Sequence, residues 1–379
     1  MALRGVKVVE LAGLAPAPFC GMILADFGAR VIRVDRTKQK FSNDRLARGK
    51  ESVAINLKDK DGVKILRKMC SGADVLIEPF RAGVMEKMGV GPDVLMKDNP
   101  KLIYARMTGF GQTGPLAKKA GHDINYIATS GVLSLLGRKG ENPYAPVNLL
   151  ADFAGGGLVC ALGILMALFE RSRSGQGQVI DANMVEGSAY VASWLFRSRD
   201  MPYWQSNRGE NMLDGGAAFY ETYKTKDGKY VSVGAIEPKF YSDLLKGLGL
   251  SEEEYSQLSD ADQMKRKFTE LFLTKTRDEW TEIFKDLDAC FAPILSPDEA
   301  ANHSHNRINN SFLWGHNGLC EPSPAPRLSR TPAVNQSLPQ PIVGQHSLHI
   351  LKETGFQDDE IQGFLKTGVV EDNSSSSKL

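Results

Sequence analysis

Short β-branched apolar runs alternate with helical patterns along the first half of the chain. Residues 6–12 form such a run, which suits a strand buried on both faces. Pro16 and Pro18 then open a helical stretch that ends near Gly28, and residues 29–35 predict the next strand. A strand, a helix and a strand within about 35 residues make a βαβ unit, so we expect a parallel sheet flanked by helices.

The same alternation continues to about residue 200. It predicts an amphipathic helix over 61–70, strands over 74–78 and 102–107, and a helix over 158–172 followed by a strand over 178–181. The apolar run 158–169 is too short to span a bilayer, so we expect a buried helix and no membrane span.

The pattern changes beyond residue 200. Alternating aromatics on both sides of Asp227-Gly228 predict a hairpin over 219–236, and helical periodicity follows over 240–247 and 264–284. Prolines between 322 and 341 indicate an extended connector, after which 344–370 is helical again. We therefore expect an α/β fold with a large Rossmann-like parallel-sheet domain (1–200), a smaller α+β domain (201–320) and a connector, C-terminal helix and tail that return to the large domain (321–379).

Composition narrows the function classes. The 379 residues are 42% hydrophobic and 24% charged with a net charge of +1, so no overall field attracts nucleic acid or an anionic membrane. Five cysteines, never in CxxC spacing, disfavour a disulfide framework or a zinc site.

The N-terminus lacks the long apolar core of a signal peptide. Ser377-Lys378-Leu379 matches a peroxisomal address, which predicts the import receptor as a partner.

The turn after the first strand tests whether the βαβ unit binds a dinucleotide. It reads Gly13-Leu14-Ala15-Pro16-Ala17-Pro18 instead of GxGxxG, and the prolines remove N–H donors that a pyrophosphate needs. We therefore disfavour a nicotinamide cofactor and expect Asp35 to pair with a neighbouring arginine. Basic residues cluster nearby, either as a solvated face or around separate phosphates of a small ligand: Arg33, Arg36, Lys38, Lys40, Arg45, Arg48 and Lys50.

Two segments carry candidate proton carriers. His122 follows the loop 108–115, whose glycines allow backbone to approach a ligand, and it could begin a helix near a cleft. Asp152 precedes Phe153 and a glycine triplet at the start of the apolar helix, where N-capping is the alternative role. From the residues alone, a structural role is the simpler interpretation of both. We expect the other five histidines to be structural or solvated: His303, His305, His316, His346 and His349.

Several long segments in the right order resemble the class III CoA-transferase family. They are RGKESV at 48–53 with Asn56-Leu57-Lys58, IEPFRAGV at 77–84 and YARMTGFG at 104–111. The segments GHDINY at 121–126 and LADFAGG at 150–156 resemble the α-methylacyl-CoA racemase branch in particular. The similarity continues through 214–216 and 234–238 almost to the C-terminus. The resemblance implies interconversion of (2R)- and (2S)-2-methylacyl-CoA thioesters, among them branched-chain fatty acyl-CoAs and bile-acid intermediates.

The resemblance also implies roles for individual residues. One group removes the α-proton and a second delivers a proton to the opposite face of an enolate, and the residues matching this pair are His122 and Asp152. Imidazole and carboxyl groups have ordinary pKa values of ~6.5 and ~4, so modest shifts poise them for this task. Glu237 matches a glutamate that orients the histidine. A backbone N–H near Asp123 matches the donor that stabilises the enolate oxygen.

By the same resemblance, Arg36 and the segment Ile55, Asn56, Leu57 and Lys58 contact CoA. The segment Gly121, His122, Asp123, Ile124, Asn125 and Tyr126 lines the substrate. No metal or redox cofactor is implied, since CoA is part of the substrate. The family forms an interlocked homodimer, and its substrates agree with a peroxisomal location, a mitochondrial share being left open.

Two alternatives follow from the same segments. A CoA-transferase of this family uses the aspartate matching Asp152 as a nucleophile that forms a mixed anhydride and then an enzyme thioester. His122 favours the racemase, because a transferase needs no base at that position. The second alternative is a non-catalytic acyl-CoA-binding protein, which the intact pair of His122 and Asp152 disfavours.

Overall fold

The computed structural model describes residues 1–39, 44–315 and 318–374, so Lys40, His316 and the Ser377-Lys378-Leu379 address lie outside the described residues. The chain forms two compact units. The first comprises 1–131, 146–191 and 308–379, and the second comprises 132–145 and 192–307. The sequence-based boundaries at 200 and 320 fall 9 and 13 residues after the breaks at 191 and 307, and the segment 132–145 belongs to the second unit.

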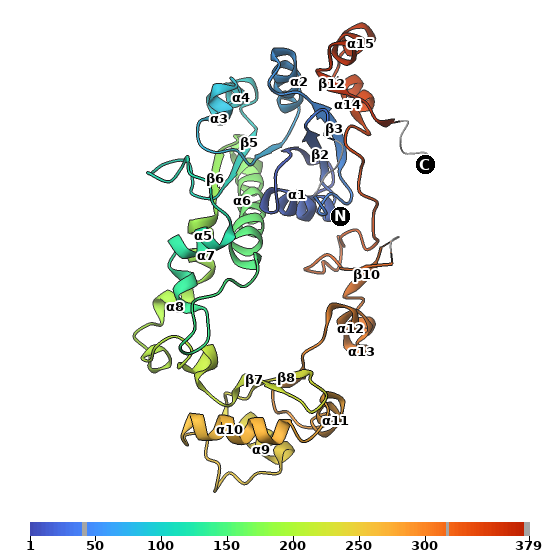
Figure 1. The fold of residues 1–379 in the computed structure, drawn as a ribbon. Helices are drawn as coiled ribbons and strands as arrows, with labels where there is room; N and C mark the ends of the chain where they lie inside the picture. The colour runs from blue at the N-terminus through green and yellow to red at the C-terminus, as the bar shows by residue number, and fades with distance from the viewer. Residues whose placement is uncertain (40–43, 316–317, 375–379) are drawn as a thin grey trace. The chain divides into compact units, whose positions relative to one another are not determined.

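A seven-stranded sheet forms the centre of the first unit in the described part of the chain (Figure 1). Its order is β12-β3-β2-β1-β4-β5-β6, and neighbouring strands are parallel except β12, which runs antiparallel to β3. The predicted α/β architecture is therefore confirmed. The strands are β1 (Lys7–Leu11), β2 (Arg30–Asp35), β3 (Glu51–Ile55), β4 (Val75–Glu78), β5 (Ile103–Thr108), β6 (Val179–Asn183) and β12 (Val370–Glu371).

Helices cover both faces of this sheet. On one face, α1 (Pro16–Asp26) and α6 (Val159–Ser174) pack against each other and the strands. On the other, α2 (Lys60–Ser71), α14 (Ser347–Glu353) and α15 (Asp358–Thr367) share one apolar core with strand residues, although the sequence separates them by nearly the whole chain (Figure 1). The remaining elements are α3 (Val84–Lys87), α4 (Pro92–Asp98), α5 (Asp123–Thr129), α7 (Met184–Val191), β10 (Phe312–Trp314) and β11 (Cys320–Pro322).

The apolar helix begins with a wide π-helical segment, η2 (Leu149–Leu158), which continues directly into α6. Asp152 is the fourth residue of η2 and Asn148 precedes it, so the interpretation of Asp152 as an N-cap is wrong. The glycine triplet explains the packing around η2. A Cβ on Gly155 would lie 2.5 Å from the backbone nitrogen of Ser188, and one on Gly157 would lie 2.6 Å from the Pro16 carbonyl. Backbone contact therefore fixes η2 between α7 and α1.

Gly187 of α7 is the residue that packs against the backbone of Gly155. Gly187→Ala is expected to destabilise the protein by ~3 kcal/mol, because the added methyl group would displace the backbone of η2. Its Cβ would lie 1.8 Å from the Gly155 carbonyl oxygen. Gly363, inside α15, has open space around its Cβ position and is the matched control. Gly363→Ala should stabilise by up to ~1 kcal/mol through helix propensity. Urea unfolding compares the two variants, and equal midpoints would refute the close contact.

One face of α6 is buried and the other is not. Cys160, Ala161 and Ile164 face the unit. Exposed apolar side chains form a stripe with helical spacing that begins at the last residue of η2 and continues along α6: Leu158, Leu162, Leu165, Met166 and Phe169. The expectation of a buried helix over 158–169 is wrong for this face. The stretch Leu149–Ser174, 26 residues long, has the length and composition of a membrane-crossing helix, which is weak evidence for a span because core helices meet the same criteria.

The second unit contains the predicted hairpin as β7 (Tyr220–Lys224) and β8 (Tyr230–Gly234), extended by β9 (Phe291–Pro293). The helical pattern over 264–284 divides into two helices, α10 (Ala261–Phe272) and α11 (Arg277–Ile283), because Thr276 and Glu279 cap each other's backbone at the start of α11. The other elements are η1 (Val132–Leu135), α8 (Ser193–Arg197), η3 (Pro202–Trp204), η4 (Met212–Gly216), α9 (Pro238–Leu248), α12 (Pro297–Asn302) and α13 (Ser304–Ile308).

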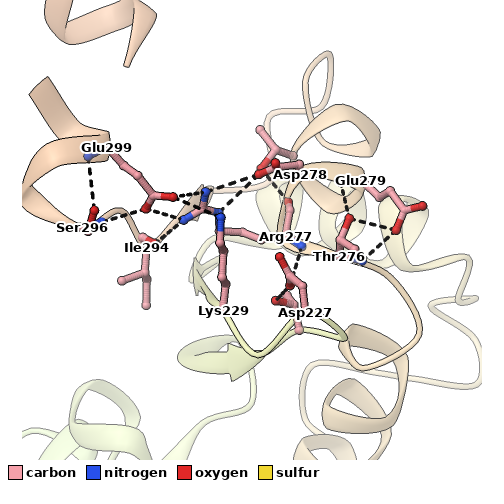
Figure 2. A network of polar contacts seen from close by, with 11 residues as sticks. Asp227, Lys229, Thr276, Arg277, Asp278, Glu279, Ile294, Ser296 and Glu299 are labelled. Carbon is pink, nitrogen blue, oxygen red and sulfur yellow. Dashed lines mark hydrogen bonds and ion pairs between the residues drawn. The ribbon is translucent and has the colours of Figure 1, made fainter. Parts of the chain in front are cut away.

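A polar network joins the start of α11 to α12 (Figure 2). The guanidinium of Arg277 donates two hydrogen bonds of 2.8 Å to Glu299, and its backbone N–H donates to Asp227. Lys229 also donates to Glu299, at 3.1 Å. The hydrogen bonds from Arg277, from the Ser296 backbone N–H and from Lys229 hold the pKa of the Glu299 carboxyl far below its usual range. The network connects α11 and α12 with the turn between β7 and β8.

Candidate active site

His122 lies at the N-terminal boundary of α5, as the sequence predicted. Its backbone is extended (φ −132°, ψ 175°), and its carbonyl accepts the N–H groups of Asn125 and Tyr126. The side-chain oxygen of Asn125 in turn accepts the His122 N–H at 3.1 Å. The imidazole is exposed, as is Ile124, so both point toward solvent or a ligand.

Asp152 is half-buried in η2, and its carboxylate is oriented by a residue that the sequence did not reveal. Asn148 donates its side-chain N–H to Asp152 Oδ2 at 3.0 Å. Burial raises the pKa of the Asp152 carboxyl, the Asn148 hydrogen bond lowers it, the charge of Asp123 raises it and that of His122 lowers it. The i,i+4 spacing of Asn148 and Asp152 was the only local signal for this pair.

Asp123 connects the two segments that carry the candidate pair. It follows His122 directly, it is only 3% exposed, and its Oδ2 accepts the backbone N–H groups of Ala151 at 2.7 Å and of Asp152 at 2.8 Å. The first turn of any helix leaves N–H groups without intrahelical acceptors, and here a neighbouring helix supplies the acceptor. His122 and Asp152 are thereby held within one unit by short contacts.

Tyr126 explains both Gly121 and Gly109, the second of which we had assigned to ligand approach. A Cβ on Gly109 would lie 2.2 Å from the Tyr126 ring, and one on Gly121 would lie 2.6 Å from it. The Tyr126 hydroxyl donates to the Gly121 carbonyl, and its ring packs edge-on against Phe110 at 5.0 Å. These glycines make room for a buried tyrosine under the loop. Burial and the nearby charge of Asp152 raise the pKa of the Tyr126 hydroxyl.

A separate cavity of about 590 Å³ lies at the carboxyl ends of β1, β2 and β3, within the size range of small-ligand sites. Open parallel sheets bind ligands at this edge. Arg36 and the segment Ile55, Asn56, Leu57 and Lys58 all line it, together with Lys38, Phe80 and Thr367. The C-terminus completes its wall, because the Val369 carbonyl accepts the Asn56 N–H at 2.8 Å and Glu371 accepts the Lys38 N–H at 2.6 Å.

The basic cluster divides into buried ion pairs and cavity residues. Arg33 donates to Asp35 at 2.9 Å, which confirms the expected arginine partner of Asp35, and Lys50 donates to Glu10 with both side chains fully buried. Arg48 pairs with Asp26 at 2.7 Å. Arg36 and Lys38, in contrast, are exposed at the cavity. The interpretation as a solvated face is therefore wrong for Arg33, Arg48 and Lys50, whose charges are paired inside the protein, whereas Arg36 and Lys38 lie at a cavity as the ligand interpretation expected.

Glu237 lies in the second unit, where it precedes the first residue of α9 and is exposed. Its charge contributes to the raised pKa of the Cys290 thiol, after the larger effect of burial. Its role toward the imidazole of His122 stays a prediction.

Comparisons with known proteins identify the family of the chain. Residues 3–347 match the model of CoA-transferase family III. The chain is 58% identical to alpha-methylacyl-CoA racemase of Mus musculus and 54% identical to that of Homo sapiens, over the full length of each chain. It is 29% identical to succinyl-CoA:glutarate CoA-transferase of Homo sapiens, covering 98% of this chain and 91% of that one.

The fold is also that of solved structures. A CAIB/BAIF family protein from Brucella suis superimposes with a TM-score of 0.77 and 26% identity, covering 93% of this chain and 99% of that one. With the family model matching most of its length, the chain belongs to CoA-transferase family III.

Proposed function

We propose that this chain is a racemase that interconverts (2R)- and (2S)-2-methylacyl-CoA thioesters, including branched-chain fatty acyl and bile-acid thioesters. The observation that carries the proposal is the pair of unlike proton carriers, His122 and Asp152, which Asp123 ties together across two helix starts. The racemase relatives of 58% and 54% identity support it.

The reaction needs two groups because inversion requires proton carriers on both faces of a planar intermediate. One group of the pair takes the α-proton, and the electron pair of the broken C–H bond moves into the thioester to form an enolate. The other group then delivers its proton to the opposite face, which re-forms a C–H bond with inverted configuration. The pair starts and ends with one proton in total. Burial raises the pKa of the Asp152 carboxyl, which favours its protonated form more than in an exposed aspartate and suits a group that must both take and deliver a proton.

In this proposal, the CoA part of the substrate and the thioester oxygen are bound by groups of complementary charge and polarity. Arg36, Lys38 and Lys58 supply positive charge for CoA phosphates at the cavity, and Ile55, Asn56 and Leu57 supply contacts for its adenine. The backbone N–H of Asp123, in the first turn of α5, stabilises the enolate oxygen, where one such donor is worth about 3 kcal/mol. Glu237 orients the histidine. The reaction requires no metal or redox cofactor.

The test incubates one 2-methylacyl-CoA diastereomer with the protein in heavy water, with a free carboxylic acid added, and follows both by NMR. The proposal predicts deuterium at the α-carbon and formation of the second diastereomer, with CoA remaining on its original acyl group. Movement of CoA to the added acid without α-exchange would instead identify a CoA-transferase that uses Asp152 as nucleophile. Binding without either reaction would identify a non-catalytic carrier.

We further propose that the protein forms a homodimer and that a second copy covers the apolar stripe of α6. The stripe supports this because its side chains range from 39% exposed for Leu165 to 62% for Phe169. Sedimentation equilibrium should give a dimer, and Met166→Glu should weaken it. A stable, active monomer would contradict the proposal.

We propose a peroxisomal location, with import through a receptor that reads Ser377-Lys378-Leu379. Imaging of the full chain in cells, with and without these three residues, tests this. Import that persists after their removal would refute the address.

A further inference from the structure

We propose that the carboxylate of Asp123 is a positioning residue that sets the geometry of the proton-transfer pair. This inference rests on the proposed function, since it concerns the same two residues. It is distinct from the role of the Asp123 backbone N–H, because it concerns the side chain, whose Oδ2 binds the start of η2.

Asp123 connects the two residues of the proposed proton-transfer pair. Its backbone is joined directly to His122, and its Oδ2 holds the N–H of Asp152 itself at 2.8 Å and that of the fully buried Ala151 at 2.7 Å. One side chain therefore fixes the separation of the two backbones that carry the reacting groups. A displacement of about 1 Å in such a pair can cost about 10²-fold in rate.

Because Asp123 accepts the N–H groups at the start of η2, the Asn148 side chain is not needed to cap this helix. An asparagine before a helix ordinarily caps the N–H groups of the first turn. Here Asp123 accepts two of those N–H groups, and the Asn148 side chain makes no capping bond, so it is available to bind Asp152 Oδ2 at 3.0 Å. Asp123 therefore positions the Asp152 carboxylate in two ways: it binds the Asp152 backbone N–H, and it leaves Asn148 available to bind the carboxylate.

A second observation indicates that Asp123 does more than cap a helix. Its other oxygen, Oδ1, is buried and has no hydrogen-bond partner within residues 1–39, 44–315 and 318–374. A half-satisfied buried carboxylate costs stability that asparagine or serine at a cap would not cost. Its negative charge acts on Asp152, whose other charged or ionisable neighbours are His122 and the Tyr126 hydroxyl.

The experiment compares Asp123→Ala and Asp123→Asn in the full-length protein. Asp123→Ala should lower kcat for α-proton exchange by about 10²-fold, with KM changed less than about threefold because the CoA cavity is built by other residues. Asp123→Asn keeps an acceptor oxygen and should recover most of the loss. It removes the negative charge that raises the pKa of Asp152, so the acid limb of its pH–rate profile should move to lower pH. The matched control is Asp260→Ala, which removes a single N–H contact of 2.7 Å at the start of α10 and should leave kcat unchanged.

A direct readout keeps this inference separate from the proposed function. Carboxyl ¹³C NMR of labelled aspartate should show a lower pKa for Asp152 in Asp123→Asn than in the unaltered protein, whether or not the protein is active. An unchanged Asp152 titration, or a kcat within twofold of normal in both variants, would overturn the positioning role. Absence of exchange in the unaltered protein would instead overturn the proposed function, and the titration would still decide the role of Asp123.

Discussion

Replacing His122 by alanine or Asp152 by asparagine is expected to slow inversion of the α-carbon by about 10³-fold. Each variant keeps one proton carrier, whereas inversion needs one on each face of the enolate, and a positioned acid or base contributes about 10²- to 10⁴-fold. Because the exposed imidazole and the half-buried carboxylate do not line the cavity proposed for CoA, affinity for CoA should remain within a few-fold. Rates of diastereomer formation and isothermal titration with CoA measure the two quantities.

The control for the histidine is His349→Ala, which removes an imidazole that lies at the surface of α14 near Glu353. It should leave inversion unchanged. Inversion that persists in either His122→Ala or Asp152→Asn would show that another residue carries the proton.

Replacing Lys50 by methionine is expected to destabilise the first unit by about 3–5 kcal/mol, the usual cost of breaking a buried ion pair. The Lys50 ammonium donates to both carboxylate oxygens of Glu10 and to the Pro18 carbonyl, and neither side chain of the pair is exposed. Methionine leaves the Glu10 carboxylate without its counter-charge. Gly21 of α1 leaves no room for Glu10 to move, because even a Cβ there would lie 1.6 Å from its Oε2.

The stability lost in Lys50→Met should increase as the pH rises. Burial raises the pKa of Glu10 to about 7 even with Lys50 present. A carboxyl whose pKa is higher in the folded protein than in the unfolded chain loses stability as pH rises from about 4 to 7. Without Lys50 this pKa is higher still, so the deficit of Lys50→Met should be larger at pH 8 than at pH 5. Urea unfolding at both pH values tests this, and Glu10→Leu combined with Lys50→Met should recover much of the loss. A pH-independent deficit would contradict the role of Glu10.

The local pattern of apolar and polar residues predicted β1, α1 and β2 correctly, because the residues within these elements favour the structures that they form. β1 and β2 are β-branched runs, and both prolines at the start of α1 occupy positions that favour a helix start. Strand β3 escaped prediction because Glu51 and Ser52 are polar. Their side chains face buried or half-buried partners, since Ser52 donates to Asp35 and Glu51 accepts from Arg30. Those partners lie elsewhere in the sequence, so no local pattern reveals them.

In the candidate site, too, local sequence predicted some features, whereas others depend on contacts between distant segments. His122 at a helix start could be predicted from its neighbours, and a resemblance to a family was needed to select it together with Asp152. The π-helical turns around Asp152 depend on the contact of Gly155 with Gly187, and the hydrogen bonds of Asp123 depend on a segment 28 residues away. Such contacts between separate segments are set by tertiary packing, which a period or a motif does not encode.

The most direct test of two-faced proton transfer gives each diastereomer separately to His122→Ala and to Asp152→Asn in heavy water. A remaining base can still remove and return the α-proton on its own face. We therefore predict that each variant exchanges the α-proton of one diastereomer without inverting it, and that the two variants act on opposite diastereomers. Exchange of the same diastereomer by both variants, or inversion by either, would contradict the assignment of His122 and Asp152 to opposite faces.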